Sequence, residues 1–551
     1  MVTIIVNIIS VAALIGIAAL RIISIKERTN EENKQHDEKN DNLIDNFINS
    51  HYKIILAVFF ILVFITRIYK FGEIPSFIQV DEAGAAYDAY CLAEYGVDRY
   101  LNSYPLYLIN FGGGQSVLYA YATIPFIKLL GTNIIAYRLP ELIFFLMGIV
   151  VCYILVNKVK DKKTALLYTF LVIISPWNIE ASRQGLDCNL LAPMFMLDLL
   201  LLINAKKNYQ YIIAGISIGI TLYTYCLSWL LIPAFLAVYI IYMLIIKKIN
   251  FKQIILMGIP IAIFATPLIY LLLLNKGYAS RTNFGIFTIP KLFSFRQGEI
   301  SIYNIIHYGK YSLKTIFCNP YGMYIVQIPL FLIGFLVGIG EFIKSIKTKE
   351  FNFTGLITIV FAVLLVCNLL VTVGTLNRAN ILYLPMLYII TIGIMELSKG
   401  SKSTLFSIIV ILTTLFIVFE ASYFNKNNEN ARWQNYPYTD KEIYDITQKL
   451  ENDDETKDVK KYFSISNKAE TYIYTMLINL PSPYELQFET WQKVKNYEEY
   501  NFIYNKTITE EMVNEKSIIV INKRQEDLIE GLERMNFSKE ETGLYCIMKN
   551  F

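Results

Sequence analysis

Long apolar stretches that alternate with short basic loops constrain the fold of this chain more than any other feature. A helix needs about 20 apolar residues to cross the roughly 30 Å of hydrocarbon in a bilayer. Stretches near this length lie at residues 3–25, 53–70, 138–158, 164–181, 188–205, 209–226, 228–246, 252–274, 323–343, 353–373, 380–398 and 404–422. The first has its basic residues at its far end, unlike a secretory signal, and is interpreted as a retained helix. The sequence therefore predicts an all-α polytopic membrane protein with about twelve transmembrane helices.

Basic residues in every second loop predict how these helices are oriented, because Lys and Arg concentrate in cytoplasmic loops. The basic loops are residues 26–53, 158–163, 206–207, 247–248, 344–349 and 399–402. The opposite segments are then extracytoplasmic, and they are residues 71–137, 182–187, 275–322, 374–379 and the tail after 423. The predicted helices and the predicted sidedness agree with each other along the whole chain.

The long outer segments are expected to have structure of their own. Residues 83–95 and 115–130 are interpreted as helices that lie in the membrane interface. The polar tail has apolar alternation typical of strands at 459–464, 517–521 and 544–548, with helices starting near 439, 468 and 524. The predicted domains are an N-terminal transmembrane helix with a cytoplasmic linker (1–52), a membrane domain with outer loops 71–137 and 275–322 (53–423), and a small extracytoplasmic α/β domain (424–551).

An adjacent acidic pair, Asp81–Glu82, lies in the first large outer segment. Neighbouring carboxylates at a membrane face repel each other and are partly desolvated, and such costly groups often have a function. The alternative is an exposed helix N-terminus, where acids interact favourably with the helix dipole. Asp187, in the link 182–187, is a third candidate, with a solvated loop charge as its alternative.

Positive charges gather on the same predicted face. The candidates are Arg138, Arg183, Arg281, His307 and Arg378. Guanidinium groups bind phosphate in a bidentate fashion, so these residues predict an anion site. Structural chance is the alternative, since long loops are partly exempt from the charge bias. Carboxylates that accept a proton and cations that hold a phosphate suit a reaction in which a lipid phosphate leaves and a hydroxyl attacks.

Three motifs, in order, give the chain a resemblance to a known family. They are Val-Asp-Glu at 80–82, Ala-Tyr-Arg-Leu-Pro at 136–140, and Ser-Pro-Trp at 175–177 followed by Arg183 and Asp187. This order resembles the protein O-mannosyltransferase and lipid A aminoarabinose transferase family, which consists of membrane glycosyltransferases with the C-type fold. The resemblance covers roughly residues 53–400 and is strongest over 75–200.

The resemblance implies transfer of a sugar, with inversion, from a polyprenyl-phosphate-linked donor to an acceptor hydroxyl. Asp81 would be the general base, Glu82 would support it or help to bind the substrate, and Asp187 would match a second acidic position beside the acceptor or a metal. Arg138, Arg183 and Arg378 would be candidates for binding the donor phosphate. It further implies a multi-pass protein of the plasma membrane whose active site faces outward and whose acceptor is a glycan, lipid or protein.

The chain also departs from the family's pattern. Where aminoarabinose transferases commonly have Lys-Pro-Pro, residues 112–116 read Gly-Gly-Gly-Gln-Ser, which puts a lysine contribution to phosphate binding in doubt. The eukaryotic luminal repeat domain is not evident, and an α/β tail takes its place. The metal requirement stays open: Asp81 and Asp187 could share a divalent cation, but no His/Cys cluster supports one.

Two other classes of protein stay under consideration. A transporter or flippase of a lipid-linked saccharide would need functional charges deep in the bilayer and repeat symmetry, and neither is evident in the sequence. A non-catalytic envelope assembly protein would bind through the tail and tolerate neutralised acids. A net charge of +4 is too small to indicate binding to nucleic acid.

Overall fold

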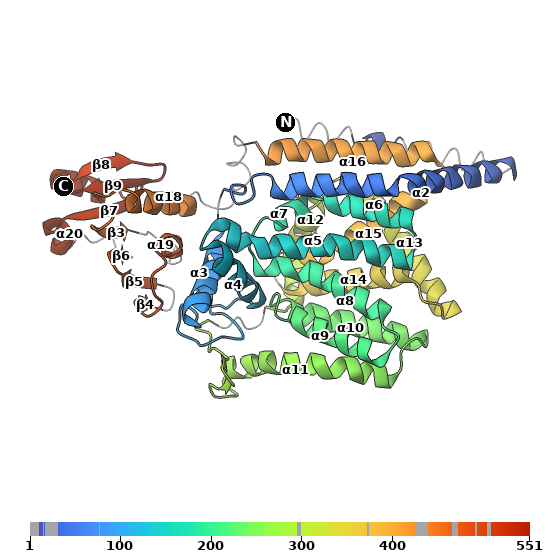
Figure 1. Ribbon diagram of the computed structural model, residues 1–551, viewed down its shortest axis with the longest axis horizontal. Coiled ribbons are helices and arrows are strands. Elements are labelled where there is room, and N and C mark those ends of the chain that lie inside the picture. The colour runs from blue at the N-terminus through green and yellow to red at the C-terminus, as the bar shows by residue number, and fades with distance from the viewer. Residues whose placement is uncertain are drawn as a thin grey trace.

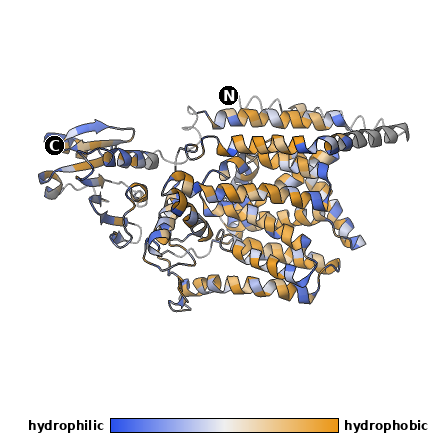
Figure 2. Ribbon diagram, viewed as in Figure 1, coloured by the Kyte–Doolittle hydropathy of each residue, from blue (hydrophilic) through white to orange (hydrophobic). Residues whose placement is uncertain are grey.

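The computed structural model describes most of the chain. The described residues are 10, 12–14, 16, 31–76, 78–294, 299–371, 374–425, 439–464, 472–490, 493–503 and 509–551. Figure 1 shows a bundle of roughly parallel helices with a smaller domain at one of its ends. The hydropathy colouring separates the apolar bundle from the mixed surface of that domain (Figure 2).

Within the described residues, nine helical segments are long and apolar enough to cross a bilayer. They are the Asn46–Ile68 part of α2 (Glu31–Ile68), α5 (Ile134–Val159), Asp187–Asn204, α10 (Ser228–Ile245), α11 (Phe251–Asn275), α13 (Gln327–Thr348), α14 (Phe353–Val371), α15 (Asn380–Leu397) and α16 (Lys402–Tyr423). Asp187–Asn204 comprises the 3-10 turn η1 (Asp187–Leu190) and α8 (Leu191–Asn204). The prediction of a polytopic helical membrane protein is confirmed.

Three of the twelve predicted spans differ in detail. The first, 3–25, lies almost wholly outside the described residues. The span predicted at 164–181 consists of α6 (Lys162–Ile174) and α7 (Pro176–Ala181), because Pro176 lacks the amide hydrogen that would continue α6. The span predicted at 209–226 is the short helix α9 (Asn208–Thr221). The linker expected before residue 53 is helical from residue 31 and continuous with the span that follows it.

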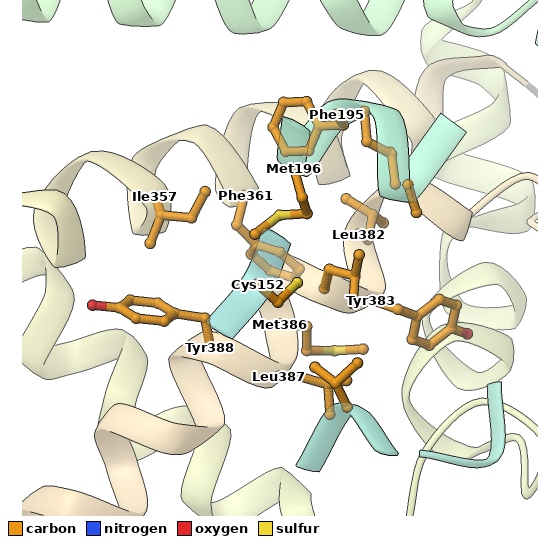
Figure 3. Packing of buried hydrophobic residues seen from close by; sticks show 14 of the residues in the cluster. Cys152, Phe195, Met196, Ile357, Phe361, Leu382, Tyr383, Met386, Leu387 and Tyr388 are labelled. Carbon is orange, nitrogen blue, oxygen red and sulfur yellow. The ribbon is translucent and has the colours of Figure 1, made fainter. Parts of the chain in front are cut away.

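The core of the bundle lies around α15, whose residues are almost all buried. Figure 3 shows its Leu382, Met386 and Leu387 side chains among residues of the neighbouring helices. Glycines permit close contact with α13: a Cβ atom on Gly334 would lie 1.9 Å from the Ile389 carbonyl oxygen. Small residues at such contacts are typical of helix packing in membranes.

One end of the bundle carries the outer segments. The helices there are α3 (Val80–Tyr95), α4 (Leu118–Leu130) and α12 (Ile302–Cys318), and a hairpin joins β1 (Asn283–Phe284) to β2 (Phe287–Thr288). Both predicted interface helices are present, whereas α12 and the hairpin were not predicted. Figure 1 places α3 and α4 between the bundle and the small domain, at the end opposite to the start of α2.

The C-terminal domain is a mixed sheet with helices, as predicted. Its strand order is β4-β5-β6-β3-β7-β9-β8, with β3 parallel to both β6 and β7 and the other pairs antiparallel. The strands are β3 (Lys460–Ser464), β4 (Gln487–Thr490), β5 (Lys493–Tyr497), β6 (Tyr500–Ile503), β7 (Ser517–Asn522), β8 (Ser538–Glu541) and β9 (Tyr545–Lys549). The helices are α18 (Thr439–Glu451), α19 (Tyr472–Asn479), α20 (Glu510–Asn514) and α21 (Glu526–Arg534).

Candidate active site

The loop at residues 108–116 brings two of the predicted acids to one place. Its ends pair through reciprocal backbone hydrogen bonds between Leu108 and Gln115, both 2.9 Å long. Gly112 and Gly114 have φ values of +83° and +95°, which only glycine adopts readily. The Gly-Gly-Gly-Gln-Ser sequence thus forms a tight loop, and the residues around the turn reach Asp81 on one side and Asp187 on the other.

Asp81 lies exposed in the first turn of α3, with its carboxylate held by two amides. The Asn110 Nδ2 atom donates to Oδ1 over 3.1 Å, and the Gln79 Nε2 atom donates to Oδ2 over 3.1 Å. Gln79 also caps the helix by accepting from the Asp81 and Glu82 amides. Asp81 and Glu82 do lie in the first turn of a helix, where acids interact favourably with the helix dipole. That interaction does not account for the contact of the Asp81 side chain with Asn110.

A buried ion pair, Arg99 with Asp88, binds the same Asn110 side chain. Arg99 donates to the Asn110 Oδ1 atom over 3.2 Å and is itself paired with Asp88, with an Nη2–Oδ2 distance of 2.8 Å. Arg99 and Asp88 are both fully buried. Arg99, Asn110 and Asp81 therefore form a continuous hydrogen-bonded chain that orients the Asp81 carboxylate.

Asp187 is buried beside the same loop. Its Oδ2 atom accepts from the Ser116 amide over 3.0 Å, its carboxylate also interacts with the Gln115 side chain, and its charge interacts with that of Asp81. Gln115 in turn donates to the Asp81 carbonyl oxygen over 3.4 Å. Two acids far apart in the sequence are thus both bonded to residues of one loop.

Arg378 lies on the Asp187 side of this site. It is half-buried at the start of α15, and its charge interacts with Tyr225, which also interacts with Asp187. Arg378 therefore stays a candidate for binding an anion at this site.

Glu82 does not face the same space as Asp81. Its carboxylate is buried and binds Arg138 through two hydrogen bonds of 2.6 and 3.1 Å, and it accepts from the Gly185 amide over 2.9 Å. Arg138 is fully buried and also donates to the Pro75 carbonyl oxygen. The pair joins α3 to α5, so it holds the site in place. The predicted contact of Glu82 with substrate and of Arg138 with phosphate is corrected accordingly.

Arg183 has a different role from the predicted one. A guanidinium group has five N–H donors, and those of Arg183 donate to five carbonyl oxygens at the end of α2 and just beyond. The acceptors are the carbonyl groups of Thr66, Arg67, Tyr69, Lys70 and Ile74, at 2.7–3.1 Å. Because its donors are used in this way, the prediction that Arg183 binds a phosphate is wrong for this structure.

Arg281 lies at the edge of a cavity next to the acids. The cavity has a volume of about 460 Å³, and its lining includes Tyr100, Asn102, Ile109, Arg281, Lys291 and Phe293. Ile109 directly precedes Asn110, so the cavity adjoins the chain that orients Asp81. Lys291 supplies a second cation, which the sequence analysis did not identify as a site residue.

His307 is not brought into this site by any contact that the structure describes. It is exposed on α12 and stacks on Tyr303, with ring centroids 3.7 Å apart.

An apolar groove lies on the other side of the β1–β2 hairpin. Its volume is about 430 Å³, and its lining is almost entirely apolar. The lining residues include Leu118 and Tyr121 of α4, Phe264 of α11, and Phe284 and Phe287 of the hairpin. Arg281 precedes this hairpin and Lys291 follows it, so one element borders both the cationic cavity and the groove.

Glu141 is an acid that the sequence interpretation missed. It is fully buried in α5, and its charge interacts with those of Asp187 and Glu82. Neither of its carboxyl oxygens has a hydrogen-bond partner among the described residues. The sequence did contain a signal for this residue, because Glu141 is an acid within a predicted span, three residues after Arg138.

No group of three or more His, Cys, Asp or Glu side chains that could hold a metal ion occurs within the described ranges. A divalent cation shared by Asp81 and Asp187 therefore stays a prediction.

A methyl group on Gly84 should disturb the chain that orients Asp81. The added Cβ atom would lie 2.4 Å from the Asn110 Oδ1 atom and 2.8 Å from the Arg99 Nη2 atom. Alanine favours the helix by about 1 kcal/mol, while overpacking costs about 1–3 kcal/mol. We expect Gly84→Ala to change the melting temperature little and to lower turnover at least about tenfold. Gly309→Ala is the control, since its Cβ would meet nothing closer than 3.8 Å. Equal turnover in both variants would contradict the orienting role.

Comparison with known proteins identifies the class of fold. Residues 115–270 match the family model described as dolichyl-phosphate-mannose-protein mannosyltransferase. The structure is similar to ArnT from Cupriavidus metallidurans bound to undecaprenyl phosphate, with a TM-score of 0.55 at 10% identity, over 91% of this chain and 98% of that one. It is also similar to the Archaeoglobus fulgidus oligosaccharyltransferase in complex with Zn and sulfate, with a TM-score of 0.52 at 11% identity, over 86% and 68% of the two chains.

The chain therefore has the fold of the C-type membrane glycosyltransferases, and the resemblance inferred from its motifs is confirmed. Its membrane domain carries the segment that matches the mannosyltransferase family model, and its overall fold is similar to that of ArnT. No curated protein sequence matches the chain significantly.

Proposed function

We propose that this protein transfers a sugar, with inversion, from a polyprenyl-phosphate-linked donor to an acceptor hydroxyl on the outer face of the plasma membrane. The observation that carries the proposal is the meeting of Asp81 and Asp187 across the 108–116 loop, beside a cavity with two cations. Basic loops lie at the opposite end of the bundle (Figure 1), which supports the outward orientation.

Asp81 is the general base in this proposal, because its carboxylate is exposed and held in a fixed orientation by Asn110. It takes the proton of the acceptor hydroxyl as the oxygen attacks the anomeric carbon. The bond from that carbon to the phosphate oxygen breaks, and the polyprenyl phosphate leaves with the electron pair. Attack on the face opposite the leaving group inverts the configuration. Asp187 binds the acceptor or helps to hold a cation in the same space.

In this proposal, the donor binds in the cationic cavity and in the apolar groove, both of which the β1–β2 hairpin borders. Arg281 and Lys291 bind the phosphate, where their charge stabilises the negative charge that develops on the leaving group. The apolar groove between α4, α11 and the hairpin takes the prenyl chain. Arg378, near Asp187, is the remaining cation for the phosphate. The ArnT structure bound to undecaprenyl phosphate supports a donor of this class.

The direct test compares cells with and without the protein by mass spectrometry of polyprenyl-linked sugars and of envelope glycans. We expect one lipid-linked sugar to accumulate and one glycan modification to disappear when the protein is absent. Purified protein in liposomes should then consume that lipid and release polyprenyl phosphate. Unchanged lipid and glycan profiles would overturn the proposal. Movement of the intact lipid across the bilayer without release of polyprenyl phosphate would favour the flippase.

Removal of the two cavity cations should weaken donor binding. Hydrogen bonds to charged groups contribute about 1.5–3 kcal/mol each, and 1.4 kcal/mol is about tenfold in affinity. We expect the Arg281→Ala/Lys291→Ala variant to bind a polyprenyl phosphate at least about tenfold more weakly, as measured by calorimetric titration in detergent. Lys310→Ala, on the exposed surface of α12, is the control. Wild-type affinity in the double variant would remove Arg281 and Lys291 from the phosphate site.

A further inference from the structure

The C-terminal domain packs directly on the helix that carries Asp81. Residues of α3 and of the domain share one hydrophobic core, in which Ala86 and Tyr87 lie with Phe463 and Tyr472. The Tyr87 hydroxyl donates to the Pro481 carbonyl oxygen over 2.7 Å, and the Tyr90 hydroxyl donates to that of Leu480 over 3.0 Å. Figure 1 shows α19 facing α3.

One contact from this domain reaches the chain that orients Asp81. Tyr472, the first residue of α19, is fully buried, and its hydroxyl makes no hydrogen bond within the described residues. Its ring packs against Phe111, at 6.3 Å between centroids, and Arg99 lies over the same Phe111 ring at 5.2 Å. Through the Phe111 ring, Tyr472 therefore helps to fix Arg99, which in turn binds Asn110.

A second contact reaches the cationic cavity. Phe488 of β4 stacks on Tyr100, with centroids 5.1 Å apart and an interplanar angle of 24°. Tyr100 lines the cavity that holds Arg281 and Lys291, and it also packs against Phe293 of the same lining. The domain thus fixes one wall of that cavity.

We infer that the C-terminal domain is a positioning part of the active site, which acts through two adjacent residues: Tyr472 fixes Arg99 on the side of the base, and Phe488 fixes Tyr100 on the side of the donor phosphate. This inference rests on the proposed function. Arg99 leads to the Asp81 carboxylate through Asn110, and Tyr100 lines the cavity. Tyr472 interacts with both Arg99 and Tyr100, whereas Phe488 stacks on Tyr100. A domain that served solely to bind a partner would not need to contact both.

The first test uses Tyr472→Leu, which removes the aromatic ring and its contact with Phe111 but keeps an apolar side chain. We expect the amides in peptides covering residues 79–84 to exchange at least about tenfold faster, because the support of the first turn of α3 weakens. Turnover should fall at least about tenfold, as expected when a catalytic group is misplaced. Tyr497→Leu is the control, since it removes a buried aromatic ring of the same domain that packs against Tyr500 and Phe502. Exchange that matches the wild-type protein in Tyr472→Leu would overturn the inference.

The second test uses Phe488→Ala on the half-buried edge strand β4. We expect at least about tenfold weaker binding of a polyprenyl phosphate, with exchange at residues 79–84 unchanged. Tyr484→Ala is the matched control, because Tyr484 also makes an aromatic contact between the domain and α3, with Tyr95 at 6.1 Å, but it is far along the helix from Asp81. Equal binding by the two variants would overturn the role of Phe488. If the wild-type protein consumed no lipid-linked sugar, the proposed function would fail, whereas the exchange data would still decide the positioning role of Tyr472.

Discussion

Asp81→Asn should fold and bind a polyprenyl phosphate as the wild-type protein does, but lose at least about a hundredfold in turnover. A positioned general base contributes about 10²–10⁴-fold to a rate, and an amide cannot accept the proton. The substitution keeps the size of the side chain and an oxygen that can accept from Asn110, so the 3.1 Å contact survives. The measurement is release of polyprenyl phosphate from purified protein in liposomes, with affinity for a polyprenyl phosphate measured in parallel.

Asp454→Asn is the control for this experiment. Asp454 is an exposed acid of the C-terminal domain, and its carboxylate pairs with Lys457 over 2.7 Å. It has no described contact with Asp81 or Asp187, nor with the residues that line the cationic cavity. We expect its turnover to stay close to that of the wild-type protein. If Asp81→Asn released polyprenyl phosphate at the wild-type rate, Asp81 would not be the base.

Glu82→Gln should have the largest effect on stability of any single change at this site. It leaves the fully buried Arg138 without its counter-charge, and removal of one partner from a buried ion pair costs about 3–5 kcal/mol. We therefore expect a clear fall in melting temperature in detergent, together with loss of turnover. Asp81→Asn, at the neighbouring exposed carboxylate, should melt at the wild-type temperature.

The double variant Glu82→Gln/Arg138→Met separates charge imbalance from packing. Methionine fills much of the arginine volume without a charge, so we expect it to recover a large part of the stability lost in Glu82→Gln. Turnover should stay low, because the pair also fixes the angle between α3 and α5. A Glu82→Gln variant that melted at the wild-type temperature would show that this pair does not hold the site together.

The sequence predicted the membrane helices well because each crossing needs a long apolar run, a requirement that is local. It predicted less well where a short element breaks a run, as at Pro176, or where the chain pairs with distant residues. In the C-terminal domain, the buried strands β3, β7 and β9 were predicted from their apolar residues. Strands β4 and β8 lie at the two edges of the sheet and have largely exposed residues, so they lacked that signal.

Of the predicted acids, Asp81 and Asp187 contact one loop, whereas Glu82 pairs with Arg138, and the roles of the arginines were harder to predict. Asp81 and Asp187 stood out because carboxylates at a membrane face need a reason to be there. Arg138 and Arg183 have the same residue type and predicted sidedness as Arg281, yet their N–H groups bind Glu82 and backbone carbonyls. Arg281 binds the Asn102 side chain, which also lines the cavity. The contacts that a guanidinium group makes depend on what folds against it, and those partners lie far away in the chain. Glu141 and Arg99 were missed for the same reason.

Arg183, whose side chain binds the carbonyl groups at the end of α2, also gives the two acids a shared point of attachment. Arg183 lies four residues before Asp187, and its contact Ile74 lies seven residues before Asp81. Each acid is therefore linked to the end of α2 by a short stretch of chain, although about a hundred residues separate the two acids in the sequence. If α2 tilts when the bilayer thickness changes, both short stretches move with its end. We therefore expect the distance between the two acids to depend little on the thickness of the membrane.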